Sequence, residues 1–191
     1  YDFIFASRKV IKNSELISEN QNSYYKEDIW SLVGQEVKHL IPKGYTLYGE
    51  IVGYTPSGTM IQKNYDYGCK KGEHKFIIYR ITYTNIDGVV RELSANHIKE
   101  FCDERGLLFS EYLIFSGRAN EFYSFEEGMS PRDWQEGFYQ KLVDNYTEKD
   151  CPFSVNKVPE EGIVVRVDSG KGYKAFKLKS QRFILWVMKE H

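Results

Sequence analysis

The chain has 191 residues, of which 41% are hydrophobic and 16% aromatic, enough for one large domain or two small ones with a substantial core. A formal net charge of -1 excludes a protein that binds nucleic acid through a globally basic surface, so any polynucleotide contact must come from a local basic patch. The scattered cysteines Cys69, Cys102 and Cys151 lack the paired spacing of a metal site and favour a reducing, cytoplasmic compartment. No apolar run approaches membrane-spanning length, so we expect no membrane partner.

The N-terminal part predicts a strand, a loop and a helix. Residues 1–6 favour a strand that ends at Ser7 and Arg8, and the polar residues 13–22 favour a loop. Residues 28–40 place apolar side chains at helical spacing and are followed by a proline and a glycine. We expect this helix to belong to the core.

The middle of the chain predicts a pair of strands. Residues 46–53 have strand character but include Glu50, and a carboxylate within an apolar run needs a partner or a ligand if it is buried. Residues 54–58 predict a proline-initiated turn, whereas the β-branched and aromatic residues 75–83 predict a strong strand. That strand leads into the hairpin signal at residues 85–88.

Further helices are predicted from their capping residues. Ser94 or Asn96 can cap a helix that ends at a glycine, and Ser130, followed by a proline, opens another. Ser180 can cap a short helix at residues 183–188. Because helices and strands mix without regular βαβ alternation, the expected fold class is α+β, with antiparallel-rich twisted sheets and flanking helices.

Near the C-terminus, the sequence predicts a β-hairpin. Residues 162–168 and 173–179 read as two antiparallel strands, joined by a turn that Ser169, Gly170 and Gly172 make possible.

The second strand of this hairpin carries a pair of lysines on one face. Side chains alternate along a strand, so Lys177 and Lys179 share one face, whereas Phe176 and Leu178 share the face expected to pack on a core. Two neighbouring ammonium groups repel each other unless an anion lies between them, which favours a phosphate site. The alternative is a solvated edge strand, where lysines are common.

Several short motifs occur in a fixed order along the whole chain. They are Ser7-Arg8, Tyr48-Gly49-Glu50, the strand at residues 76–80, Glu161 to Val165 and Lys177-Leu178-Lys179. In this order they resemble the covalent nucleotidyltransferase superfamily, which includes RNA ligases, DNA ligases and capping enzymes. The Tyr-Asp-Tyr-Gly segment at residues 65–68 is most similar to the RNA ligase branch. The resemblance implies an ATP-grasp-like nucleotidyltransferase domain of the ligase type, over residues 1–191.

The resemblance also implies roles for the hairpin residues. Such enzymes transfer AMP from ATP to their own lysine, then to a 5′-phosphate, and finally seal that end to a 3′-OH. Lys177 and Lys179 would contact the α-phosphate, and Glu161 would hold Mg²⁺ or Mn²⁺, a hard cation suited to oxygen ligands. Glu160 competes with Glu161 for the metal, and we prefer Glu161 because it directly precedes the glycine.

Other matched residues would bind the nucleoside. Glu50 would bind the ribose hydroxyls, and Arg8 would contact ribose or phosphate. Tyr79 would stack on the adenine, with Phe76 as the rival residue on the opposite face of the same strand. Each also has an ordinary structural explanation: a salt-bridged glutamate, a surface arginine or a core aromatic.

Two departures from the family pattern stand out. The nucleophilic lysine, two residues before Asp-Gly, is absent, and the nearby Lys9 and Lys12 lack the Asp-Gly context. We therefore expect a domain truncated at its N-terminus that cannot self-adenylate. Arg80 also stands where the family usually has an acidic residue after the stacking aromatic.

The expected function is that of an ATP-dependent RNA ligase, a monomer that acts on RNA or nicked duplex ends. The residues after Lys179 are too few for an OB-fold domain, which favours this branch over DNA ligases and capping enzymes. Two other functions stay open: a non-catalytic module or fragment that binds nucleotides or RNA ends, and a DNA ligase adenylation domain. An α+β interaction domain whose motifs are coincidental is a further alternative.

Overall fold

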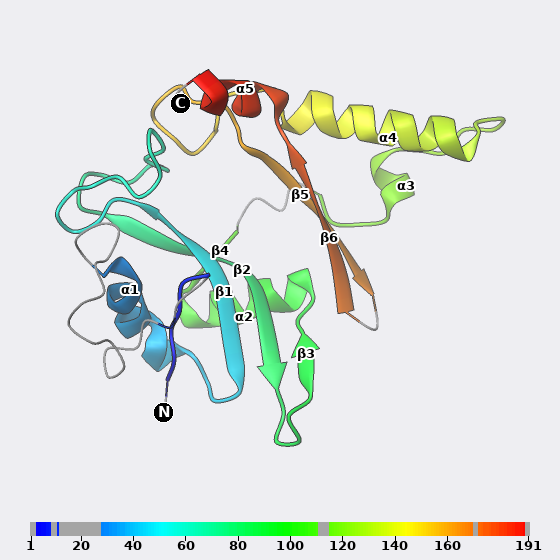
Figure 1. Ribbon diagram of the computed structural model, residues 1–191. Coiled ribbons are helices and arrows are strands. Elements are labelled where there is room, and N and C mark those ends of the chain that lie inside the picture. The colour runs from blue at the N-terminus through cyan, green and yellow to red at the C-terminus, as the bar shows by residue number, and fades with distance from the viewer. Residues whose placement is uncertain (1–2, 9–10, 12–27, 111–114, 170–171, 190–191) are drawn as a thin grey trace. The chain divides into compact units, whose positions relative to one another are not determined.

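The computed structural model describes every residue except 1–2, 9–10, 12–27, 111–114, 170–171 and 190–191 (Figure 1). The chain divides into two compact units, residues 1–110 and 111–191, and each is described by itself. Each unit combines helices with antiparallel strands, which confirms the predicted α+β class.

The first unit is built on an antiparallel sheet. Its strands are β1 (Tyr45–Gly53), β2 (His74–Thr84) and β3 (Val90–Glu92) in the order β1-β2-β3, and the short β4 (Leu108–Phe109) pairs in parallel with β2. The two longest strands confirm the predictions at residues 46–53 and 75–83. The predicted turn at residues 85–88 joins β2 to β3, where the side-chain oxygen of Asn85 accepts hydrogen bonds from the N–H groups of Asp87 and Val89.

Two helices of this unit begin and end at the residues that favour such ends. α1 (Ile29–Val37) continues into a 3₁₀ turn, η1 (Lys38–Leu40), and is capped by Asp28, whose carboxylate accepts from the N–H of Ser31 at 3.2 Å. α2 (Ala95–Arg105) is capped by Ser94, the first of the two predicted candidates. It ends at Gly106, whose φ of 64° suits a residue without Cβ.

Both helices cover the same face of the sheet (Figure 1). Ile51 pairs with Phe76, so their side chains share a face, and alternation along β2 adds Ile78 to it. α1 packs against Ile51, while α2 packs against Ile78. The core lies on this face, which leaves Glu50, one residue before Ile51, on the opposite one.

A β-bulge in β2 changes which residues reach that opposite face. Tyr48 pairs with Arg80 but Gly49 pairs with Ile78, so Tyr79 is an extra residue without a partner in β1. Ile78 and Ile81 are both fully buried in one core cluster although they are three positions apart. The bulge therefore places two consecutive side chains, those of Tyr79 and Arg80, on the face away from the core.

The second unit contains three helices and a hairpin within its described residues. Its elements are α3 (Ala119–Phe122), α4 (Pro131–Tyr146), β5 (Gly162–Ser169), β6 (Gly172–Lys179) and α5 (Gln181–Lys189). The hairpin β5–β6 and both predicted caps are confirmed: Ser130 accepts from Asp133 N–H, and Ser180 accepts from Phe183 N–H, each at 3.1 Å. Aromatic side chains of α3 and α4 pack together, with the Phe122 and Phe138 rings 5.5 Å apart.

The predicted N-terminal strand is not a regular strand in residues 3–8. Ala6 makes an isolated antiparallel bridge with Ile11, and its neighbours in this range belong to no sheet. A short bridge of this kind leaves the apolar residues without the partner strand that their pattern predicts. The loop predicted at residues 13–22 lies outside the described residues, as do Lys9 and Lys12. In the described part of the chain, no helix has both the length and the hydropathy to cross a bilayer.

Candidate nucleotide site

The hairpin β5–β6 brings three of the predicted site residues together. The Glu161 Oε1 atom accepts a hydrogen bond from Lys177 Nζ at 2.8 Å and lies 3.9 Å from Lys179 Nζ. All three side chains are partly exposed, between 31% and 52%. The lysines therefore share one face, as predicted, and the anion between them is the carboxylate of Glu161.

Strand register explains why Glu161 reaches both lysines. Gly162 pairs with Lys179, and Val164 pairs with Lys177, so Glu161 precedes the strand at the end where the lysines lie. Gly162 has a φ of 137°, and a Cβ there would stand 2.1 Å from the carbonyl oxygen of Leu178. The Glu-Gly sequence thus lets the backbone approach β6 closely enough for the carboxylate to turn toward the lysines.

The opposite face of the hairpin differs from the prediction. Phe176 was expected to pack on a core, but its side chain is 58% exposed, whereas Leu178 is partly buried. The hairpin is a two-stranded sheet in the described residues of its unit, so the part remote from α5 has no second layer to cover it. The prediction that side chains alternate along the strand was correct, but the prediction that a core lies beneath Phe176 was wrong.

The two adjacent glutamates have different environments. Glu160 is partly buried, and its carboxylate accepts a long hydrogen bond, 3.4 Å, from the N–H of Gly162. Burial raises the pKa of Glu160, and this effect outweighs the hydrogen bonds from the backbone, which lower it. Glu161, in contrast, faces the two lysines.

In the first unit, the face of the sheet away from the core carries two more of the predicted residues. Glu50 is exposed and pairs with Ile77, whereas Tyr79 is 50% exposed at the bulge. Because Glu50 is exposed, its carboxylate does not need the partner that a buried carboxylate would require. A half-exposed tyrosine beside an exposed carboxylate offers a ring and an acceptor on one surface.

Phe76 and Arg8 occupy different settings. Phe76 is partly buried and packs against both core clusters of the first unit, so its ring serves the core. Of the two aromatic residues, Tyr79 is the more exposed. Arg8 is exposed at a bend after residues 3–7.

Arg80, where the family usually has an acidic residue, has a partner from the neighbouring strand. Its guanidinium donates from Nε to both carboxylate oxygens of Glu92 at 3.1 Å, and a second, shorter bond joins Nη2 to the same group. The guanidinium carbon also lies 4.3 Å from the centre of the Tyr48 ring, in a cation–π contact. Sequence reasoning missed Glu92, although the hairpin turn at residues 85–88 places it on the strand next to Arg80.

The metal prediction rests on a single carboxylate. Within the described residues, no group of three or more His, Cys, Asp or Glu side chains is arranged to hold a metal ion. Glu161 also lies beside two ammonium groups, which repel a cation. It fits a divalent ion only when substrate phosphates supply further oxygen ligands, which is the usual way in which proteins bind Mg²⁺.

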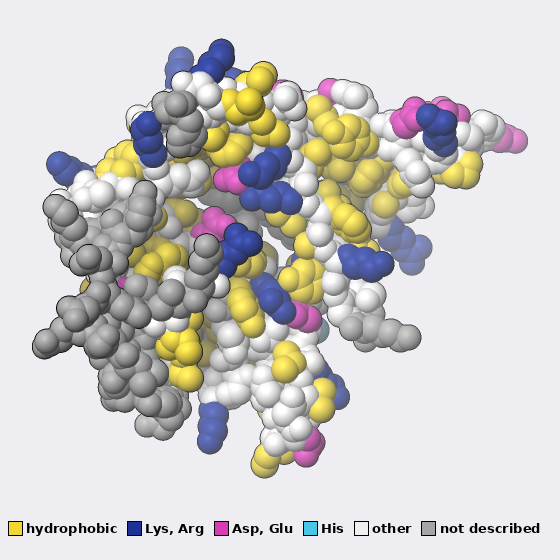
Figure 2. Space-filling view, viewed as in Figure 1, with side chains coloured by type: hydrophobic (Ala, Val, Ile, Leu, Met, Phe, Trp, Pro, Cys, Tyr) yellow, Lys and Arg dark blue, Asp and Glu magenta, His cyan; other side chains and the backbone are white. Residues whose placement is uncertain are grey.

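Charge elsewhere on the surface is mixed. Figure 2 shows basic and acidic side chains interspersed over the described part of the face in view, as expected from the net charge of -1.

A Glu-Gly hairpin with paired lysines, together with a Gly-Glu strand in the other unit, has the features expected of the ligase-type nucleotidyltransferase class. The family model described as RNA ligase matches residues 3–180, which include every predicted site residue. The chain belongs to the RNA ligase family. A comparison with curated proteins gave no match.

Proposed function

We propose that this protein is an ATP-dependent RNA ligase domain that seals 5′-phosphate and 3′-OH ends through enzyme-AMP and AMP-polynucleotide intermediates. The observation that carries the proposal is the Glu161 carboxylate held between Lys177 and Lys179 on the Glu-Gly hairpin. Family membership supports a ligase-type function, and the paired cations suit the phosphates of ATP.

In this proposal, the lysines neutralise charge during phosphoryl transfer. Negative charge develops on the α-phosphate oxygens and on the leaving pyrophosphate as the bond to phosphorus forms and breaks. Lys177 and Lys179 would move from Glu161 to these oxygens, and the freed carboxylate would then be available to Mg²⁺ or Mn²⁺. A bound divalent ion supplies further charge neutralisation at the phosphates.

The first unit would bind the nucleoside. Tyr79 would stack on the adenine, Glu50 would accept hydrogen bonds from the ribose hydroxyls, and Arg8 would contact ribose or phosphate. The Arg80–Glu92 ion pair supports this assignment, because the carboxylate of Glu92 neutralises the positive charge of Arg80, the residue next to Tyr79. The face then favours an uncharged base.

Self-adenylation needs a lysine that the printed sequence lacks. The sequence contains no Lys-x-Asp-Gly, and its Asp87-Gly88 pair follows Asn85 in the exposed β2–β3 turn. We therefore expect the 191-residue chain to bind ATP without forming a covalent adduct. If the parent protein also lacks such a lysine, the chain is a non-catalytic module that binds nucleotides or RNA ends.

Calorimetry with ATP and GTP tests the nucleotide site, and labelled ATP with Mg²⁺ followed by denaturing electrophoresis tests covalency. We expect ATP to bind, GTP to bind more weakly, and no labelled band to form. The Lys177→Ala variant should lose ATP affinity, whereas the control Lys174→Ala, on the other face of β6, should keep it. Equal affinity for ATP and GTP would contradict an adenine pocket, and competition between RNA and DNA ends would separate an RNA ligase from a DNA ligase.

A further inference from the structure

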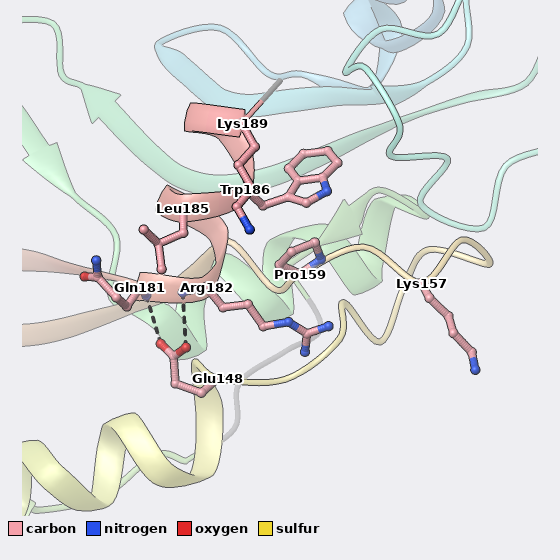
Figure 3. A pocket seen from close by; sticks show the side chains of 8 residues that line it. All are labelled: Glu148, Lys157, Pro159, Gln181, Arg182, Leu185, Trp186 and Lys189. Atoms are coloured by element: carbon pink, nitrogen blue, oxygen red, sulfur yellow. Dashed lines mark hydrogen bonds between the residues drawn. The ribbon is translucent and has the colours of Figure 1, made fainter. Parts of the chain in front are cut away.

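A pocket lies in the second unit. It is an open pocket of about 400 Å³, formed by α5, the second residue after α4 and the segment before β5 (Figure 3). Its lining residues are Glu148, Lys157, Pro159, Gln181, Arg182, Leu185, Trp186 and Lys189. None of them is among the residues assigned above to ATP.

The pocket has an excess of positive charge. Three of its lining residues, Lys157, Arg182 and Lys189, are cationic, and only Glu148 is acidic. Arg182 donates one of its N–H groups to Asp150 at 2.5 Å, and this ion pair fixes the position of the guanidinium. The guanidinium carries five N–H donors in all, so this bond uses only one of them.

The carboxylate of Glu148 is hydrogen-bonded to the backbone of α5. Its two oxygens accept hydrogen bonds from the backbone N–H groups of Gln181 at 2.8 Å and Arg182 at 3.1 Å, so the carboxylate caps α5 (Figure 3). Burial acts to raise the pKa of Glu148, but these bonds, with those from Thr147 and Ser180, outweigh it and lower that pKa. The carboxylate is thus ionised but turned to the helix, where it offers a ligand little repulsion.

Apolar side chains complete the pocket. Trp186 and the buried Pro159 lie on the same side of it in Figure 3, and Leu185, 51% exposed, adds to the apolar surface. A tryptophan and cations that line the same pocket are a combination with which proteins hold single-stranded nucleic acid, because the ring stacks on a base while the cations contact phosphates.

We propose that this pocket binds one nucleotide of the RNA strand to be joined, with its base against Trp186 and its phosphate near Arg182 and Lys189. The proposal rests on the proposed function, because it adds a contact for the polynucleotide to a domain that handles RNA ends. Only Ser180 separates α5 from β6, so the strand that carries the lysine pair leads directly into the pocket wall. One RNA end can therefore follow the chain from the pocket toward Lys179.

The first experiment measures binding of a fluorescein-labelled, single-stranded oligoribonucleotide by anisotropy at several salt concentrations. Each phosphate contact contributes about 0.7 to the slope of log Kobs against log salt for single strands, so the Lys157→Ala, Lys189→Ala double variant, which removes the assigned contact of Lys189, should lose about 0.7. The double variant Lys38→Ala, Lys43→Ala removes the same charge from exposed positions of the other unit and should leave the slope unchanged.

The second experiment uses Trp186 as the reporter. The sequence has three tryptophans, and replacing Trp30 and Trp134 with Phe leaves the indole of Trp186 as the only one. Its fluorescence should be quenched by the oligoribonucleotide, and Trp186→Leu in the otherwise natural chain should weaken binding about tenfold, within the range for loss of base stacking. Circular dichroism melting checks that each variant folds.

Two results would overturn the pocket assignment. One is an unchanged affinity and salt slope in the Lys157→Ala, Lys189→Ala variant, and the other is quenching of Trp186 by AMP at the same concentration as by the oligoribonucleotide. Calorimetry with ATP separates this test from that of the proposed function. Loss of oligoribonucleotide binding with intact ATP binding in the pocket variants supports the pocket, whereas oligoribonucleotide binding by a natural chain that binds no ATP rejects the proposed function alone.

Discussion

Replacing Lys177 or Lys179 with Ala should have unequal effects on stability. Lys177 Nζ lies 2.8 Å from Glu161 Oε1 and Lys179 Nζ lies 3.9 Å from it, with all three side chains partly exposed. In water, a pair of unit charges at about 3 Å gains roughly 1.4 kcal/mol, and the pair at about 4 Å gains about 1 kcal/mol. Solvent screening and side-chain entropy reduce such values to about 0.2 to 1 kcal/mol for exposed pairs.

Repulsion between the two lysines lowers both losses, because either substitution relieves it. Removing Lys179 relieves this repulsion while it breaks only the longer contact, so its loss of unfolding free energy should be close to zero. Removing Lys177 also relieves it but breaks the hydrogen bond, so the loss should be about 0.5 kcal/mol. Either substitution should weaken ATP binding by about 1.5 to 3 kcal/mol, because charge-assisted hydrogen bonds to phosphate are lost.

Urea unfolding at about 0.05 M and about 1 M NaCl measures the first effect, and calorimetry with ATP measures the second. The difference between the two variants should disappear at high salt, where the Debye length is about 3 Å. Lys174→Ala, on the opposite face of β6, is the matched control. The reasoning would be refuted if Lys179→Ala were as destabilising as Lys177→Ala, or if the difference persisted in high salt.

Four other outcomes are expected. Gly162→Ala should lower the free energy of unfolding by more than about 2 kcal/mol in urea titrations, because its Cβ would meet the Leu178 carbonyl oxygen at 2.1 Å; a neutral result would contradict the close approach. Arg80→Ala should leave Glu92 without its ion-pair partner and weaken ATP binding by less than tenfold, which calorimetry checks. The pKa of Glu148 is lowered below 4.5, so its contribution to stability is present above that pH and is lost as pH falls through the folded pKa; Glu148→Gln should destabilise at pH 7, and this effect should shrink as pH falls below 4.5 in thermal melts. Burial raises the pKa of Cys102 to about 11, so iodoacetamide should label it at pH 8 only after unfolding, as mass spectrometry would show.

Much of the local structure could be predicted because it depends on neighbours in the sequence. The hairpin at Gly162–Lys179, the caps at Ser94 and Ser130 and the β2–β3 turn all follow from alternation, capping chemistry and turn residues. The lysine pair was predicted for the same reason, since two residues apart on a strand share a face. A nearby anion was also expected, although the sequence suggested phosphate and the structure provides Glu161.

The rest could not be predicted because it depends on contacts between distant residues. Nothing in the composition of residues 75–83 reveals the bulge at Tyr79, which arises from pairing with β1. The exposure of Phe176 depends on whether a second layer covers the hairpin, which alternation does not report. The pocket at α5 was also missed, because Glu148 and Arg182 are brought together by the cap on α5 rather than by a motif.

The bulge in β2 makes this strand tolerant of change at one position. Tyr79 and Arg80 both face away from the core, so either can be substituted without altering the packing of Ile78 and Ile81. Deleting Tyr79 would remove the bulge and leave Ile78, Arg80 and Ile81 in regular alternation, with Ile81 still facing the core. The extra residue at position 79 therefore allows both a point substitution and the loss of one residue without turning a core side chain outward.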